Sequence, residues 1–209
     1  MIEIATAATA NPALDPLNML GDRERAYERL AQHVPAKFRD ARVTVVEVAA
    51  WVNGLIVTAS ATKMTRVQHG GSLLLLGPTG TGKTWQAYGV LRALADSGVY
   101  CDWTMVTAPD LFASLRPRAG VDSERVYERY LGAKLLVIDD LGAQKDSEWT
   151  EEYLGRLIDA RWRDELATLI TSNVPATAFS VRFGTRITSR LGDMCTRVVL
   201  DGPDRRLTT

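Results

Sequence analysis

The sequence predicts an α/β protein built on a parallel β-sheet with helices on both faces, and three observations predict it. From residue 70 onward, short apolar runs alternate with helical patterns, as in strands joined by crossover helices. A glycine-rich loop ending in Lys83 and Thr84 joins the first apolar run to the first of these helices. A later apolar run ends in two carboxylates, Asp139 and Asp140. Together these features predict a P-loop fold.

The first 33 residues are expected to form a segment of their own, a small polar tail followed by a helix. The helical pattern runs to about residue 33, with an apolar stripe made by Leu20, Tyr27, Leu30, Ala31 and Val34. The charged face of this helix is either solvated surface or a surface that docks a partner. Residues 34–209 are expected to form the second domain.

Residues 43–58 have two readings. Alternating valines and the pair Asn53 and Gly54 fit a β-hairpin. Thr44 and Glu47 instead have the spacing of a helix capping box, and apolar residues follow at intervals of three and four. We favour the helix, with the hairpin as the alternative.

The glycine-rich loop is the strongest signal in the chain. Its glycines allow the backbone N–H groups to point inward, so that a phosphate chain can lie against them and against the start of the following helix. Lys83 is expected to reach the β- and γ-phosphates, and Thr84 to hold Mg²⁺. The predicted ATP-binding residues are Gly77, Pro78, Thr79, Gly80, Thr81, Gly82, Lys83, Thr84 and Trp85.

The remaining elements are expected in regular alternation. Strands are predicted at residues 72–76, 100–106, 134–139, 167–172 and 196–200. Helices are predicted at residues 83–96, 109–117, 122–131, 148–163 and 184–191. The third strand ends in the two carboxylates, of which Asp139 is expected to bind the Mg²⁺ shell and Asp140 to orient the attacking water.

Two later patterns add polar groups to the same site. Asn173 directly follows the fourth strand and could hydrogen-bond the water or the γ-phosphate, although an asparagine there is also an ordinary turn residue. Arg186 and Arg190 are four residues apart and therefore lie on one helical face. Their guanidinium groups suit a phosphate, and surface salt bridges are the alternative.

Composition narrows the setting. The chain has 25 basic and 25 acidic side chains, so no overall basic field indicates nucleic acid. Its two cysteines and two histidines lack the spacing of a zinc site, and no signal peptide or membrane span is evident. A cytoplasmic protein without membrane contact is expected.

The combined motifs resemble the helicase-loader branch of the AAA+ ATPases, of the DnaC and DnaI type and close to the transposition helper IstB. The resemblance spans about residues 34–202 and depends on the P-loop, the run from 138 to 142, the run from 171 to 173 and the run from 186 to 191. It implies a three-layer core with a five-stranded parallel sheet in the order 5-1-4-3-2, preceded by a short N-terminal helical extension. Because the chain ends soon after the fifth strand, no C-terminal lid domain is expected.

The resemblance also implies roles and partners. Asn173 would be sensor 1, and Arg190 would be an arginine finger acting on ATP in a neighbouring subunit, with Arg186 as its companion. ATP hydrolysis would then depend on self-assembly into a homo-oligomer. A hexameric replicative helicase and single-stranded DNA are the partners that this branch implies.

Three functions remain open at this stage. The first is a DnaC-like loader of a replicative helicase in DNA replication, the second an IstB-like transposition helper, and the third a small-molecule P-loop kinase. The kinase leaves Asn173, Arg186 and Arg190 without a role. DNA contact is expected at Arg116 and Arg118, since Pro117 and Gly120 end a helix there and leave an exposed corner; pairing with nearby acids is the alternative.

Overall fold

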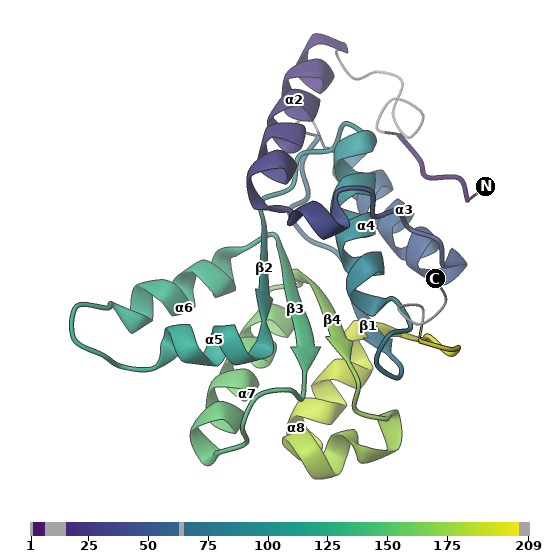
Figure 1. The fold of residues 1–209 in the computed structure, drawn as a ribbon. Helices are drawn as coiled ribbons and strands as arrows, with labels where there is room; N and C mark the ends of the chain where they lie inside the picture. Colours follow the sequence, from purple (N-terminus) through teal and green to yellow (C-terminus); the bar gives the residue numbers. More distant parts are fainter. Residues whose placement is uncertain (1, 7–15, 63–64, 205–209) are drawn as a thin grey trace. The chain divides into compact units, whose positions relative to one another are not determined.

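The computed structural model describes residues 2–6, 16–62 and 65–204 (Figure 1). The chain divides into two compact units. The sheet unit comprises Gly71–Lys83 and Trp103–Thr209, and the helical unit comprises Met1–Gly70 and Thr84–Asp102. The glycine-rich loop lies in the sheet unit, and Thr84 is the first residue of the chain's return to the helical unit.

The sheet unit contains a five-stranded parallel sheet in the order β2-β3-β4-β1-β5. Read from the other edge, this is the predicted order 5-1-4-3-2, which is confirmed. The three inner strands are buried on both faces, which explains why they appear as continuous apolar runs. The strands are β1 (Ser72–Leu76), β2 (Trp103–Thr107), β3 (Leu135–Leu141), β4 (Ala167–Ser172) and β5 (Cys195–Val199).

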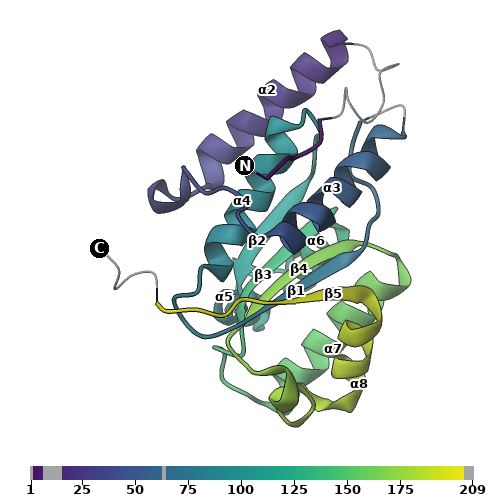
Figure 2. The same cartoon turned by 90° about the vertical axis from the view of Figure 1, so that its right-hand side faces the viewer.

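Four helices pack on one face of this sheet. Leu74, Ile138 and Ile170 from the strands share a buried core with side chains of all four helices. Figure 2 shows α7 and α8 side by side on the same side of the sheet. These helices are α5 (Ala108–Leu115), α6 (Ser123–Gly132), α7 (Glu148–Arg163) and α8 (Phe179–Met194), the last preceded by the short 3-10 helix η2 (Ala176–Ala178).

Helix α8 begins five residues before the predicted start at residue 184 and is kinked at that position. Gly184 has φ 78° and ψ 157°, a conformation that interrupts the helix and favours glycine. A Cβ atom at Gly184 would also lie 2.7 Å from Oε1 of Glu151. The predicted start of the helix therefore coincides with the kink inside α8.

The helical unit contains α2 (Pro16–His33), η1 (Ala36–Phe38), α3 (Val46–Ser60) and α4, which spans Lys83–Asp96 and so begins at the last residue of the sheet unit. The ambiguous segment is therefore a helix, with Asn53 and Gly54 inside α3. The predicted capping box is wrong, because Val45 is the N-cap and no side chain caps the helix. Thr44 instead exchanges two hydrogen bonds with the side chain of Gln86, at 3.0 and 2.8 Å.

The apolar stripe predicted for α2 is only partly correct. Leu30 is buried, but Leu20 is 63% exposed and Ala31 is exposed as well. The buried face runs through Asp22, Ala26 and Leu30. Residues 7–15 of the predicted tail lie outside the described residues, and among those described no helix is long and apolar enough to cross a membrane.

Candidate nucleotide-binding site

The phosphate-binding loop follows β1 and has a backbone that requires glycine. Gly77, Gly80 and Gly82 have φ values of 149°, 85° and 96°. A Cβ atom at Gly77 would lie 2.1 Å from the carbonyl oxygen of Leu200, so even alanine cannot fit without a backbone shift. The conformation of the loop therefore requires glycine at these positions.

Lys83 places its ammonium group inside this loop. The residue is 5% exposed, and Nζ donates to the carbonyl oxygens of Gly77 at 2.7 Å and Pro78 at 2.8 Å. Thr81 Oγ1 also donates to the Pro78 carbonyl, at 3.0 Å. The positive charge thus lies where the phosphates of a bound nucleotide would need it.

Asp204 comes from the segment after β5 and lies against the same loop, which the sequence did not predict. A Cβ atom at Gly80 would be 2.0 Å from Oδ1 of Asp204. The carboxylate therefore lies against backbone that, in a nucleotide complex, faces phosphate. No motif around residue 204 indicates this approach, because it depends on where the strand β5 ends.

Thr84 is the second residue of α4, and Trp85 is the third. Trp85 makes an edge contact with Phe38 of η1, with ring centroids 6.5 Å apart, and Phe38 stacks on Tyr88 at 4.5 Å. The described ring contacts of Trp85 are therefore within the helical unit. Its predicted role in nucleotide binding stays a prediction.

The two carboxylates at the end of β3 have different environments. Asp139 is buried at 6% exposure, and its Oδ1 accepts a hydrogen bond of 2.6 Å from Thr171 Oγ1. Asp140 is half-buried with φ 55°, a left-handed conformation that aspartate tolerates better than most residues. The β3–β4 register shifts at this point, and the Asp140 N–H donates to the same Thr171 oxygen at 2.9 Å. One threonine thus fixes both acids.

Asn173 follows β4 directly, and its side chain is exposed. Ser172, the residue before Asn173, forms hydrogen bonds with three parts of the chain. The Gly77 N–H donates to the carbonyl of Ser172 at 3.3 Å, the Val174 N–H donates to Ser172 Oγ at 3.1 Å, and Ser172 Oγ donates to the carbonyl of Leu141. The structure therefore brings the phosphate-binding loop, the acidic pair and Asn173 to one edge of the sheet, as predicted from the sequence.

Arg186 and Arg190 lie on α8 and share one carboxylate on α7. Arg186 Nη2 donates to Asp159 Oδ2, and Arg190 Nε donates to Asp159 Oδ1 at 3.2 Å. The guanidinium carbon of Arg190 also lies 3.8 Å from the centroid of the Trp162 ring. The sequence predicted the two arginines but neither of their partners.

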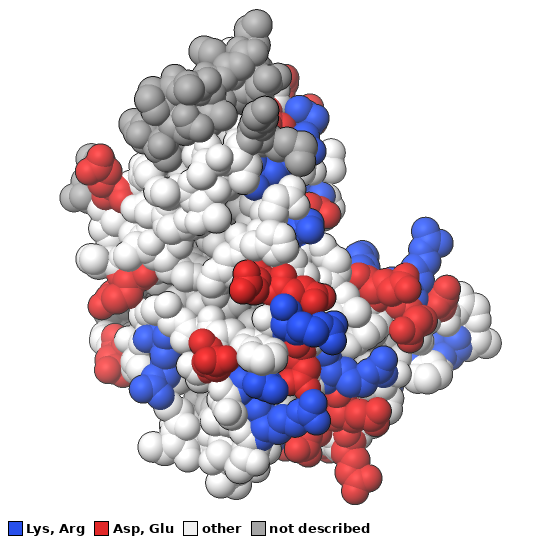
Figure 3. Space-filling view, turned by 180° about the vertical axis from the view of Figure 1, so that it is seen from behind, with Lys and Arg blue, Asp and Glu red and all other residues white. Residues whose placement is uncertain are grey.

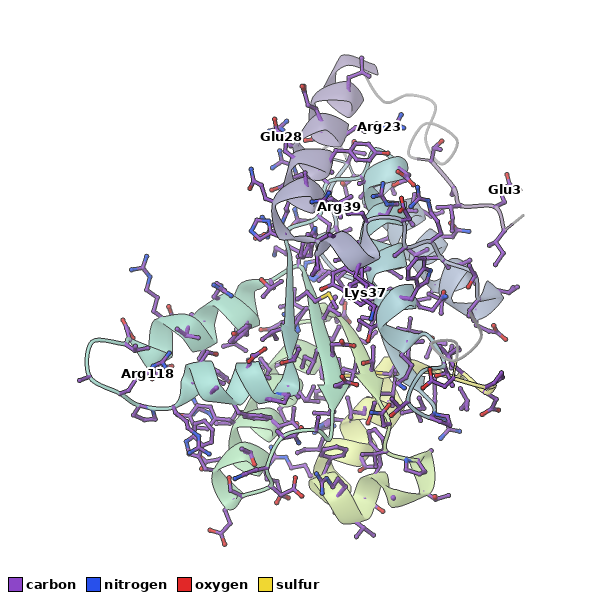
Figure 4. All side chains as sticks on the ribbon, in the orientation of Figure 1. Glu3, Arg23, Glu28, Lys37, Arg39 and Arg118 are labelled. Carbon is purple, nitrogen blue, oxygen red and sulfur yellow. The ribbon has the colours of Figure 1, made fainter. Side chains whose placement is uncertain are left out.

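Arg116 and Arg118 lie on the connection between α5 and α6, and both are exposed, as predicted. Figure 4 labels Arg118 on this connection. The Arg116 guanidinium lies over the Trp149 ring, 5.6 Å from its centroid. Among the described residues neither arginine forms an ion pair with the nearby acids. With Lys145, they line a pocket of about 530 Å³ between the end of α5 and the loop after β3.

The described part of the face shown in Figure 3 has no continuous basic patch. Figure 3 shows acidic and basic side chains interspersed over the described part of one face. This pattern agrees with equal numbers of basic and acidic residues in the chain. Any contact with nucleic acid would therefore have to be local.

Comparisons with known proteins place the chain among ATP-binding proteins. The family model described as "IstB-like ATP binding protein" matches residues 55–207. An ATP-binding protein of insertion sequence IS1162 from Pseudomonas fluorescens is 29% identical over 170 residues, which cover 77% of this chain and 71% of that protein. The replicative helicase loader DnaC of Buchnera aphidicola subsp. Baizongia pistaciae is 25% identical over 124 residues, 57% of this chain and only 50% of the loader.

The fold agrees with a solved structure of a loader. The crystal structure of the DnaC helicase loader superimposes with a TM-score of 0.63 at 21% identity, covering 80% of this chain and all of that one (100%). This similarity confirms the predicted AAA+ P-loop fold.

Proposed function

We propose that this chain, which belongs to the family of IstB-like ATP binding proteins, hydrolyses ATP in a self-assembled state and uses the cycle to load a hexameric replicative helicase onto single-stranded DNA. The observation that carries the ATPase proposal is the meeting of three loops at Ser172. There the phosphate-binding loop, the acidic pair and Asn173 share one edge of the sheet. Such an edge is where P-loop proteins hold a triphosphate and its attacking water.

Each residue then has a defined task. The loop amides and Lys83 bind the phosphates, with the ammonium group exchanging its carbonyl partners for phosphate oxygens. Asp140 accepts a proton or hydrogen bond from the attacking water and orients it. Asn173 donates to that water or to the γ-phosphate, as a sensor of its presence.

The residues present also fit Mg²⁺. The Thr84 hydroxyl and the Asp139 carboxylate are hard oxygen donors of the kind that Mg²⁺ takes, together with phosphate oxygens. Asp139 is buried, and its bond from Thr171 restrains the carboxylate. Bound at these residues, the ion would supply positive charge that offsets the negative charge of the phosphates during transfer.

Arg190 is proposed as a finger that reaches the ATP of a neighbouring subunit, with Arg186 as companion. Both arginines lie on the outer part of α8, where Arg186 has a side-chain exposure of 78% and Arg190 of 36%. Such fingers contribute on the order of 10³ to 10⁵ in kcat. A subunit alone should therefore be nearly inactive.

The partner is proposed from the relatives. The similarity to a curated DnaC loader supports a replicative helicase. The N-terminal segment, residues 1–33, is proposed as the docking element and residues 34–209 as the ATPase domain. Single-stranded DNA is proposed to follow Arg116 and Arg118 of successive subunits, and the cytoplasm is the proposed location.

A second candidate is an IstB-like helper of transposition. The specific support is the insertion-sequence relative, which has the higher identity and the larger share of both chains covered. The two candidates share the ATP site and differ only in the protein that the assembly engages. Binding of a hexameric helicase or of an IS21-type transposase, in the presence of ATP, separates them.

The ATPase proposal is tested with two substitutions in the full chain. Lys83→Ala should lose ATP binding, because it removes the buried ammonium from the loop. Asp140→Asn should keep ATP binding, and should also keep thermal stability, because asparagine tolerates the left-handed backbone. Its hydrolysis should fall by about 100-fold or more. Wild-type turnover by Asp140→Asn would refute the assigned role.

The partner proposal is tested by size-exclusion chromatography of the purified chain with each partner. A stable ATP-dependent complex with the helicase, and none with the transposase, supports the loader. The reverse result supports the transposition helper. Phosphate release per subunit should rise with protein concentration in either case, and a concentration-independent rate would refute hydrolysis between subunits.

A further inference from the structure

We infer that Asp159 and Trp162 on α7 are positioning residues that hold Arg190 ready for the ATP of a neighbouring subunit. This inference rests on the proposed function, in which Arg190 acts in trans. With Asp193, these two residues form what we call the arginine cradle. Every member lies in the sheet unit, on the packed pair of helices α7 and α8.

The contacts of Arg190 hold one part of its guanidinium group and leave another part available. Asp159 Oδ1 accepts a hydrogen bond from Nε of Arg190 at 3.2 Å, and the guanidinium carbon lies over the Trp162 ring, 3.8 Å from its centroid. Among the described contacts of Arg190, none uses the two terminal nitrogens. Those terminal groups are the ones that extend farthest from the helix and can donate to a phosphate. The arginine cradle therefore holds the guanidinium group at its Nε side and leaves the two terminal nitrogens able to donate.

The cradle itself is restrained. Trp162 Nε1 donates to Asp193 Oδ2 at 2.7 Å, which fixes the ring that Arg190 stacks on. Asp159 is largely covered, with a side-chain exposure of 24%. A guanidinium held by an ion pair and by an indole face loses less freedom when it binds a phosphate than an exposed arginine does.

Asp159 also balances the charges of the two arginines. Arg186 and Arg190 are one helical turn apart, and two like charges at this spacing repel. Asp159 gives one oxygen to each of them, so a single carboxylate relieves the repulsion and sets the distance between the two guanidinium groups. Without this carboxylate, both arginines would be free to move apart.

The residues of the arginine cradle and the two arginines lie on two helices that pack together. Asp159 and Trp162 are three residues apart on α7, and Arg186, Arg190 and Asp193 occupy one face of α8. Rigid helices hold a functional group with more precision than loops do. Because misplacement by about 1 Å costs about 100-fold in rate, loss of the cradle should lower kcat without changing ATP binding.

The test uses mixtures of two inactive full-length proteins. Lys83→Ala is the donor, since it keeps the finger but cannot bind ATP. Arg190→Ala is the receiver, since it binds ATP but has no finger. Their mixture provides the reference rate, and Asp159→Asn is then added to either the donor or the receiver.

Asp159→Asn in the donor should lower the rate of the mixture by about 10- to 100-fold, while the KM for ATP stays the same. In the receiver it should leave the reference rate intact, because the receiver supplies no finger. Asp164→Asn in the donor is the matched control, since Asp164 is an exposed acid at the end of α7 that pairs with exposed Arg163. Donor variants Trp162→Phe and Trp162→Leu should show a graded loss.

Each other outcome overturns the inference in a recognisable way. An equal loss in donor and receiver would make Asp159 a structural residue. An unchanged or higher rate with the donor variant would mean that Asp159 does not position the finger or that it withholds it. A reference mixture without activity would refute hydrolysis between subunits, and with it the cradle, before Asp159 is changed.

Discussion

Arg161 provides the sharpest test of how this fold is stabilised, because it is a guanidinium with 0% exposure at the centre of the sheet unit. Its Nε donates to Thr168 Oγ1 at 2.8 Å. Its terminal nitrogens donate at 2.6 to 3.0 Å to four backbone carbonyls, those of Tyr130, Leu131, Ala133 and Ala167. Three of these carbonyls lie at the end of α6, where a helix has no backbone donors of its own.

Arg161→Met keeps most of the side-chain volume and removes every donor. Each buried acceptor left without a partner costs about 1 to 3 kcal/mol, so the four carbonyls amount to at least about 4 kcal/mol. Removing the buried charge returns part of the cost of desolvation, which is why we take the lower end of this range. The melting temperature should fall by about 8 to 16 °C for a chain of this size.

Equilibrium denaturation in urea, followed by circular dichroism, measures the loss of unfolding free energy. Arg163→Met is the matched control, because Arg163 is two residues further along and its side chain is 69% exposed. The control should change stability by less than about 0.5 kcal/mol. A loss below about 1 kcal/mol for Arg161→Met would refute the reasoning, since the carbonyls would then have found other donors.

Three further predictions concern the site and its surroundings. Replacing Arg116 and Arg118 by Ala should weaken binding of single-stranded DNA to the ATP-bound assembly and reduce the slope of log K against log salt by about 1.4, as expected for two lost phosphate contacts; an unchanged slope would place the DNA elsewhere. Asp204→Asn should tighten ATP binding about fivefold in equilibrium titrations, because a carboxylate in contact with phosphate repels it by about 1 kcal/mol even in water; weaker binding would show that Asp204 supports the loop. Burial raises the pKa of the Cys195 thiol to about 12, and only the thiolate is reactive, so iodoacetamide should label it at pH 8 far more slowly in the folded than in the urea-unfolded protein, a difference that should shrink as the pH approaches 12.

The parts of the fold that could be predicted are those with local signals. The inner strands are unbroken apolar runs, and the phosphate-binding loop combines glycines with Lys83 in a fixed spacing. Asp139 and Asp140 follow an apolar strand, and this position alone placed them at the edge of the sheet. The strand order came from the resemblance to AAA+ proteins, because no local signal specifies which strands pair.

The predictions that failed depend on residues far apart in sequence. Thr44 has the spacing of a capping residue, but its side-chain hydroxyl accepts a hydrogen bond from Gln86, which is 42 residues away in sequence. Leu20 looks like part of a buried stripe, yet the buried face of α2 includes Asp22, which pairs with Arg25 of the same helix at 3.0 Å and with the distant Arg66 at 3.6 Å. Neither Gln86 nor Arg66 could be identified as a partner from the neighbourhood of the residue that it contacts. The same limit applies to Asp159 and Trp162, whose contacts with Arg190 are seen only when α7 and α8 are packed.

The order of residues after β4 shows how the ATP site and the finger can be linked. Thr171 and Ser172 bind the acidic pair and the phosphate-binding loop, and Asn173 follows them. The chain then enters η2 and α8, where Arg182 turns back: it donates to the Gly142 carbonyl at 2.8 Å and pairs with Asp146 at 2.6 Å. Arg182 therefore ties the segment from residue 171 to residue 190 to the loop after the acidic pair, at a point between Asn173 and the proposed finger Arg190. Under the proposed function, in which Asn173 contacts the γ-phosphate, a displacement of Asn173 would have a short path, along one stretch of chain, to Arg190.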